Sequence, residues 1–247
     1  MAGPSLPKII KGVPTFLHSG SPLPRRPLPN PEQRDQKFAR PLGEIAGKFR
    51  PQFETDDCLV AALEGIHREF FERRGIALKL DREELKGLCG YSHGTGSNAS
   101  KMVPNFNVHL RNARVAQWVE AKESIGSETT FDSLHRICEE ETTSFPIVGV
   151  GKRYWDIQTH IKLPREREMD HALVVLKAST SEVIYYDPLQ RPGSPSSPAE
   201  KVHSMPYVLL SQIENEALMA QNWMFWLAQT GWRPTLEAFP RGVITNA

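Results

Sequence analysis

Three residues of this chain have the side chains needed for nucleophilic chemistry at a carbonyl carbon. Cys58 stands at the start of an amphipathic stretch, His171 opens a run of β-forming residues, and Asp187 closes the next such run. A reactive thiol needs an imidazole to take its proton, and the imidazole needs a third group that fixes the ring. We therefore predict that Cys58 is the nucleophile, His171 its base and Asp187 the residue that orients the histidine.

Gln52 is the candidate for a fourth role, the donor that stabilises a negatively charged carbonyl oxygen during the reaction. It precedes Cys58 by six residues, in the loop that leads into the predicted Cys58 helix. Free amide groups and the macrodipole at a helix N-terminus favour negative charge and so lower a thiol pKa. Asp56 and Asp57 suit the same dipole but oppose a thiolate, so the sequence leaves their net effect on the thiol open.

The elements that must position these side chains are helical in the first half of the chain. Leu59, Leu63, Ile66 and Phe70 recur at helical spacing, and Gly75 is a suitable helix end. The pattern predicts a buried helix over residues 58–74, with Cys58 in its first turn. Further helices are predicted from Asp81, where Glu84 completes a capping-box spacing, and near residues 107–122 and 131–141.

The second half changes to β-forming runs at residues 146–150, 171–176 and 182–187. A short Ser/Thr turn joins the last two runs, so a hairpin would bring His171 and Asp187 to the same end. The domain is completed by residues 207–210, a helix at about 211–221 and a last run at 223–227. We predict an α+β fold in which the helical half, with the nucleophile helix, packs on a C-terminal antiparallel sheet.

Three segments resemble the papain-like cysteine peptidase superfamily, most closely the bacterial double-glycine leader peptidases and their relatives. They are residues 52–58, Asp170 to Val175 and Tyr185 to Pro188. The resemblance implies a papain-like fold over about residues 48–228. It also implies that the glutamine contributes to the oxyanion hole and that the aspartate before the proline is the third member of the site.

The chain departs from that family in three respects. Leu59 follows the cysteine where these peptidases usually have a small residue. The stretch from Cys58 to His171 is longer than in the leader peptidases, and residues 90–106 and 152–168 are the expected insertions. No transporter segments follow the domain, so trimming a peptide during export is not the expected role.

The first part of the chain differs in composition from the rest. Ten of the 20 prolines fall in residues 1–51, and residues 1–50 hold nine Lys/Arg against three Asp/Glu, a net charge of +6. The remainder has 21 against 26, or −5, which gives the overall +1. We predict a disordered, proline-rich basic tail at residues 1–44 and one domain at 45–247. The tail is a solvated arm or a ligand for a partner domain, and its scattered charges do not favour nucleic acid.

Other candidate sites are weaker. The sequence Gly94-Thr95-Gly96-Ser97 lacks the Gly-Lys-Ser/Thr ending of a phosphate loop and is interpreted as a polar turn. His135 and Cys138 have helical metal-ligand spacing but no further ligand nearby in sequence. Two further interpretations concern packing: Cys89 is taken as buried and inert, and Trp223, Phe225 and Trp226 as core residues.

The combined prediction is a thiol hydrolase that cleaves a peptide or isopeptide bond in a peptide or protein substrate, with no metal or organic cofactor. A bacterial regulatory, toxin or injected-effector protease fits a compact domain behind such a tail. An acyltransferase or amidase using the same residues is one alternative, and a catalytically silent peptide-binding module is another. No apolar run is long enough to span a membrane and no signal peptide is seen, so we expect a cytoplasmic protein, delivered elsewhere if it is an effector.

Overall fold

The computed structural model describes residue 37 and residues 41–51, 56–76, 78, 80–151, 154, 171–189, 202–215 and 223–230. The described helices include a single 3-10 turn, η1. They are α2 (Leu42–Ala46), α3 (Cys58–Arg73), α4 (Arg82–Leu88), α5 (Ala99–Asn112), η1 (Gly126–Glu128), α6 (Phe131–Glu139) and α8 (Tyr207–Asn215). The strands are β1 (Val119–Ser124), β2 (Ile147–Val150), β3 (His171–Ala178), β4 (Glu182–Tyr186), β5 (Val202–Pro206) and β6 (Met224–Gln229).

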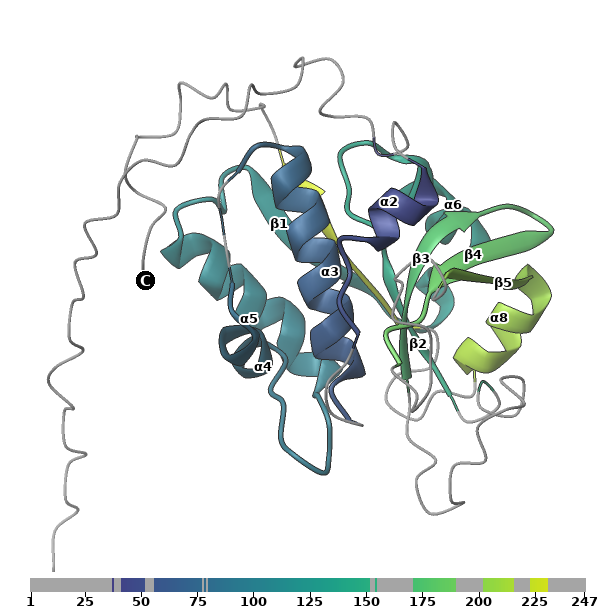
Figure 1. Cartoon of the computed structure of the whole chain (residues 1–247), viewed down its shortest axis with the longest axis horizontal. Coiled ribbons are helices and arrows are strands. Elements are labelled where there is room, and N and C mark those ends of the chain that lie inside the picture. Colours follow the sequence, from purple (N-terminus) through teal and green to yellow (C-terminus); the bar gives the residue numbers. More distant parts are fainter. Residues whose placement is uncertain are drawn as a thin grey trace, which may run out of the picture.

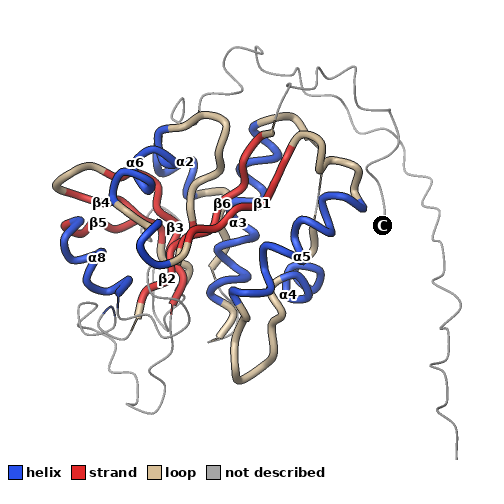
Figure 2. The backbone as a smooth tube through the Cα atoms, turned by 180° about the vertical axis from the view of Figure 1, so that it is seen from behind, coloured by secondary structure: helices blue, strands red, loops and turns tan. Residues whose placement is uncertain are grey.

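The described strands form one antiparallel sheet in the order β1-β6-β2-β3-β4-β5. The last strand of the chain, β6, lies between β1 and β2, so the sheet joins the first half of the chain to its end (Figure 2). The predicted 171–187 hairpin is formed by β3 and β4, with a register shift between Val175 and Lys177. This arrangement of helices with an antiparallel sheet confirms the predicted α+β class.

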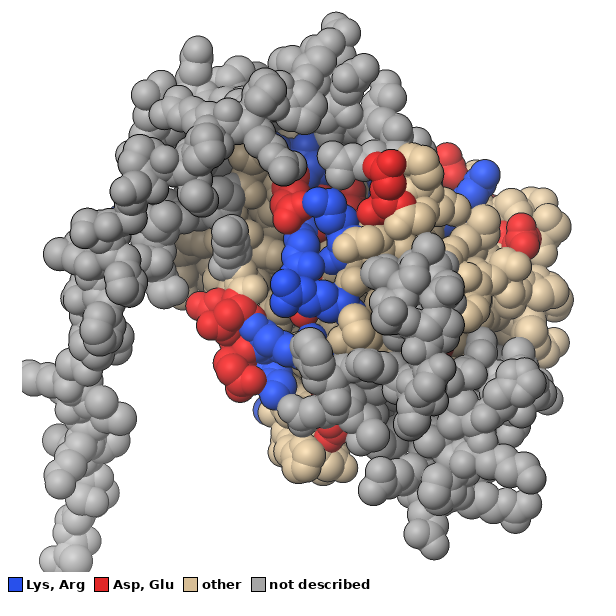
Figure 3. Space-filling model, in the orientation of Figure 1, with Lys and Arg blue, Asp and Glu red and all other residues tan. Residues whose placement is uncertain are grey.

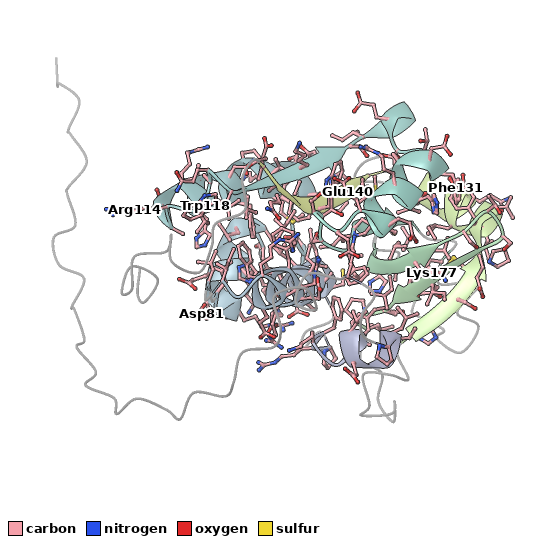
Figure 4. The ribbon with its side chains drawn as sticks, turned by 90° about the horizontal axis from the view of Figure 1, so that it is seen from above. Asp81, Arg114, Trp118, Phe131, Glu140 and Lys177 are labelled. Atoms are coloured by element: carbon pink, nitrogen blue, oxygen red, sulfur yellow. The ribbon has the colours of Figure 1, made fainter. Side chains whose placement is uncertain are left out.

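Helices cover both faces of the sheet, and β3 shows how one strand serves two cores. Val174 and Leu176 belong to the core shared with α3 and α5, whereas Leu173 and Val175 belong to the core shared with α6 and α8. This alternation follows from the two-residue period of a strand. Figure 1 shows α3 and α5 in front of the sheet, and Figure 4 shows α6, marked by Phe131 and Glu140, on one side of the strand that carries Lys177.

The two helices around the nucleophile begin where the sequence predicts. Helix α3 begins at Cys58 and ends at Arg73, and its core side chains are fully buried, among them Leu63, Ile66 and Phe70. Helix α4 begins with the predicted capping box, in which the Asp81 side chain accepts from the Glu84 amide and the Glu84 side chain accepts from the Asp81 amide. These local signals were sufficient because caps and apolar periodicity act within a few residues.

The predicted helix at residues 107–122 is wrong in its second half. Helix α5 ends at Asn112, and Arg114 takes a φ of +58°, the left-handed conformation that stops helices. Residues 119–124 instead form β1, which pairs with β6 along its whole length and is alternately buried and exposed at Val119, Glu120 and Ala121. Edge strand β5 was not predicted, and α8 begins at Tyr207, earlier than the predicted residue 211.

The folded part of the chain begins before residue 45, the predicted domain boundary. The Lys37 side chain is buried against the C-terminal end of α6, where its ammonium donates to the Ile137 carbonyl at 2.6 Å and the Thr143 hydroxyl at 3.0 Å. Helix α2 begins at Leu42, and after it the Phe49 ring lies on α3 where only a glycine leaves room: a Cβ on Gly65 would stand 1.9 Å from the ring. The rest of the predicted tail, residues 1–36 and 38–40, lies outside the described residues.

Candidate active site

Cys58 is the first residue of α3. The residue before it, Asp57, precedes the helix without capping it through its side chain. The backbone N–H groups of a first helical turn have no partner within the helix, so the thiol stands beside free donors and the positive end of the helix dipole. The Cys58 side chain is partly exposed, whereas Cys89 and Cys138 are fully buried. Among the three cysteines, solvent therefore reaches Cys58 best.

His171 and Asp187 are in direct contact at the end of the β3–β4 hairpin. His171 Nε2 lies 2.8 Å from Asp187 Oδ1, and both residues are buried, at 4% and 3% exposure. The pairing of Val174 with Tyr186 sets this contact, because it places the residue after Tyr186 near the beginning of β3. The hairpin geometry predicted from sequence is therefore correct.

Cys58 also acts on the His171 imidazole, since its side chain contributes to the raised pKa of His171. Asp187 engages Nε2, which leaves Nδ1 as the ring nitrogen available to a thiol. Burial by itself lowers the pKa of His171, but the Asp187 carboxylate and Cys58 outweigh it and raise the pKa to about 10. The structure thus places His171 against Asp187 and under the influence of Cys58, and the raised pKa favours the protonated imidazole.

The Asp187 carboxylate is held in its ionised form by the same contacts. Burial raises its pKa, yet the charge of His171 and hydrogen bonds from His171, Tyr154 and the Leu189 amide lower it to about 2. Tyr154 is a site residue that the sequence did not reveal: it lies in the stretch interpreted as an insertion, and no motif marks it. Its hydroxyl donates to Asp187 Oδ2 at 2.5 Å.

Asp57 is paired with a cation. From the sequence alone, the effect of its negative charge on the Cys58 thiol was open. Its fully buried carboxylate accepts from Arg82 Nη2 at 2.6 Å and Arg82 Nε at 3.1 Å. Arg82 also reaches Glu64 on α3 at 2.9 Å. Arg68 and Arg50 contact the same Glu64, and basic side chains form a stripe over this face of the molecule (Figure 3). The negative charge nearest to Cys58 in sequence is therefore offset by an arginine.

Asp56 is engaged by the loop that follows α4. Its carboxylate accepts from the Tyr91 hydroxyl at 2.8 Å and from the Gly94 amide. Gly94 has a φ of +84°, a conformation that favours glycine, and the loop closes through the Ser92–Gly96 bridge. The segment interpreted as a polar turn is thus tied to the residue two positions before the nucleophile.

The other residues singled out in the sequence are buried or packed against neighbouring groups. Burial raises the pKa of Cys89 well above its usual range, and raises that of Cys138 to about 12. His135 Nδ1 lies 2.9 Å from the Ala178 carbonyl, and its ring stacks on Phe131. Trp223 is buried and donates to Glu123 Oε2 at 3.1 Å. Within the described residues, no group of three or more His, Cys, Asp or Glu side chains is arranged to hold a metal ion.

Gln52, the predicted oxyanion donor, lies outside the described residues. So do Asp156 and Asp170, the other aspartates near His171 in sequence. In the part of the chain that is described, no helix is both long and apolar enough to cross a membrane.

The described residues form an α+β domain in which a partly exposed thiol at a helix N-terminus accompanies a buried histidine–carboxylate pair. No family model matches the chain, and no curated protein matches it in sequence. Among solved structures, it is similar to a double glycine motif protease from an AMS/PCAT transporter, solved in complex with the leader peptide. That match has a TM-score of 0.43 and 15% sequence identity, and covers 74% of this chain and 91% of the other. The relationship is distant, so the function proposed below rests on the site itself.

Proposed function

We propose that this protein is a papain-like thiol hydrolase that cleaves a peptide or isopeptide bond with Cys58 as nucleophile. The observation that carries the proposal is the position of His171, whose imidazole contacts the buried Asp187 carboxylate through Nε2 and interacts with Cys58 at the start of α3. A histidine used only for packing does not need a buried carboxylate on one side and a partly exposed thiol at a helix N-terminus on the other. This is the arrangement of nucleophile, base and orienting group in covalent acyl transfer.

The pKa shifts of His171 and Asp187 support the proposal of a thiolate–imidazolium pair. His171 favours its protonated form, with a pKa raised to about 10 against the opposing effect of burial, and Asp187 stays ionised beside it. In the proposed resting state the Cys58 proton is placed on His171 Nδ1, because the imidazolium and the positive end of α3 both favour a thiolate. Arg82 offsets the charge of Asp57, which would otherwise oppose the thiolate.

The proposed reaction follows from these positions. The Cys58 thiolate attacks the carbonyl carbon, and the carbonyl oxygen becomes an oxyanion facing the amide groups at the start of α3. His171 gives its Nδ1 proton to the leaving amine, which breaks the C–N bond and leaves an acyl group on Cys58. A water molecule then transfers a proton to His171 and attacks the thioester, which releases the acid and restores the thiolate–imidazolium pair. In this scheme the Cys58 amide and the Gln52 side chain donate to the oxyanion.

The decisive experiment measures how fast iodoacetamide labels Cys58 as a function of pH, by mass spectrometry of the intact chain and its peptides. An ordinary thiol has a pKa of about 8.5, so roughly a thousandth of it is ionised at about pH 5.5. A thiolate–imidazolium pair keeps its labelling rate nearly constant down to that pH. A rate that falls tenfold per pH unit below the ordinary thiol pKa would overturn the proposal.

A second measurement connects the reactive thiol to hydrolysis. A peptide library prepared from a proteome digest is incubated with wild-type protein and with Cys58→Ala, and new peptide ends are identified. Cleavage by the wild type but not by Cys58→Ala supports the hydrolase. A reactive Cys58 with no cleavage, and with transfer of an acyl group to an added amine instead, would favour the acyltransferase. Cys89 and Cys138, which are buried, serve as internal controls for unfolding in both measurements.

A further inference from the structure

Within the part of the chain that is described, the carboxylate of Asp187 accepts three hydrogen bonds, one of them from the histidine. Oδ1 receives His171 Nε2 and the Leu189 amide, each at 2.8 Å, and Oδ2 receives the Tyr154 hydroxyl at 2.5 Å. A carboxylate can rotate about its Cβ–Cγ bond unless both oxygens are held. Tyr154 is the side chain that holds the second oxygen.

Tyr154 touches the base as well as the acid. Its ring stacks against the His171 imidazole, with ring centres 5.6 Å apart and planes 22° from parallel. The side chain is fully buried, and its backbone N–H donates to the Gly151 carbonyl at 3.1 Å, one residue after β2 ends. One buried side chain therefore covers the face of the imidazole and fixes the carboxylate that orients it.

A second tyrosine, Tyr185, contacts Tyr154. The side chain of Tyr185, on β4, hydrogen-bonds the Tyr154 hydroxyl, and the two rings meet edge to face at 6.3 Å and 73°. An ionised carboxylate only accepts, so Tyr154 must donate its hydroxyl proton to Asp187, and its oxygen is left to accept from Tyr185. Tyr185 thus donates to Tyr154, and Tyr154 donates to Oδ2 of Asp187. His171 donates to the other carboxylate oxygen, Oδ1.

We propose that Tyr154 is a positioning residue that acts on Cys58 through Asp187 and His171, with Tyr185 fixing its hydroxyl. This inference rests on the proposed function, since it concerns the same site. The Tyr154 hydroxyl stabilises the negative charge of Asp187, and Asp187 in turn stabilises the protonated imidazole that accompanies the thiolate. Loss of the hydroxyl leaves Oδ2 buried without this donor, and the imidazolium loses part of its support.

The test is Tyr154→Phe, which removes the hydroxyl but keeps the ring that stacks on His171. The readout is the pH profile of Cys58 labelling by iodoacetamide. We expect the acidic midpoint of the profile to rise by about one pH unit, so that labelling below it is roughly tenfold slower than in the wild type. The matched control is Tyr186→Phe, because the buried Tyr186 hydroxyl has no hydrogen-bond partner among the described residues and its side chain belongs to the core shared with α3. That control should leave the profile unchanged.

A double-mutant cycle separates positioning from mere packing. If Tyr154 acts through Asp187, then Tyr154→Phe adds little to the shift already caused by Asp187→Asn. Additive shifts, or a Tyr154→Phe profile equal to the wild type in a protein that melts normally, would overturn the inference. Failure of the proposed function looks different: there the wild type itself lacks the acid-stable labelling of Cys58. Should Tyr154→Phe fail to fold, Tyr185→Phe, which loosens the same hydroxyl from behind, gives a smaller shift in the same direction.

Discussion

Arg82 holds the carboxylate of Asp57 with two nitrogens, at 2.6 and 3.1 Å, and so anchors helix α4 to the residue immediately before Cys58. Asp57 has no exposed surface and Arg82 is only 16% exposed, so this ion pair is well shielded from solvent. Removing one partner of a buried pair leaves the other charge uncompensated. The pair therefore links the stability of the domain to the electrostatics of the proposed nucleophile.

The first prediction concerns Arg82→Gln. We expect the free energy of unfolding to fall by about 3 kcal/mol, because the buried Asp57 side chain loses its guanidinium partner. Labelling of Cys58 at acidic pH should also slow, because the Asp57 carboxylate then opposes the thiolate. Urea denaturation measures the first effect. Lys122→Gln, which breaks an exposed pair with Glu120 on β1, is the control and should change stability by less than about 0.5 kcal/mol.

The second prediction separates the two central residues by stability. Cys58→Ala and His171→Ala should each abolish cleavage, because nucleophile and base act as one unit. His171→Ala should in addition destabilise the fold by about 3 kcal/mol, because it strands the buried, ionised Asp187. Cys58→Ala should melt close to the wild type. Equal melting temperatures for both variants would contradict the buried ion pair.

The third prediction concerns the pH dependence of stability. The pKa of His171 is raised to about 10, so its contribution is fully present below the ordinary pKa of about 6.5 and is lost as the pH rises through about 10. In Asp187→Asn the imidazole loses its carboxylate, and we expect a flatter decline over this range. Burial lowers the pKa of Lys37 to about 7, which makes stability rise with pH in the same window. That slope is common to both proteins, so the difference between their unfolding free energies isolates the histidine.

The fourth prediction concerns Asn107 on α5, which satisfies the edge of the sheet. Its side-chain oxygen accepts from the Ala121 amide at 2.8 Å, and its nitrogen donates to the Ala121 carbonyl at 3.0 Å. Asn107→Ala should cost about 2 kcal/mol, because both backbone groups lose their partner. Asn107→Asp keeps the acceptor and should cost less. An exposed neighbour on the same helix, Val108→Ala, is the control and should change urea stability little.

The fifth prediction concerns the N-terminal boundary of the folded domain. A chain starting at residue 45 lacks Lys37 and Leu42, and should melt roughly 4–8 °C below a chain starting at residue 36, a loss of about 2 kcal/mol. Lys37→Met in the longer chain tests the ammonium separately, because it keeps an unbranched apolar side chain and removes the charge that lies 5.0 Å from the centre of the Phe145 ring. Identical melting of the two chains would show that the arm adds nothing to the fold.

Local sequence signals determined the elements that carry the proposed nucleophile, base and orienting residue. The apolar spacing of Leu63, Ile66 and Phe70 and the β-forming runs at 171–176 and 182–187 placed Cys58 at a helix start and the other two residues at one end of a hairpin. These predictions held because helix periodicity and hairpin closure act over short stretches of chain.

Tertiary structure alone decided which distant groups complete the site. Tyr154 reaches Asp187 across 33 residues, and Arg82 reaches Asp57 across 25, and no local pattern encodes either contact. Residues 119–124 are a strand only because β6, about a hundred residues later, pairs with them, and this pairing overrides the weak helical preference of the segment. The helix start at Cys58 and the contact between His171 and Asp187 were thus predictable from residue type and spacing. The buried charges and hydroxyls around them depend on packing between segments far apart in sequence.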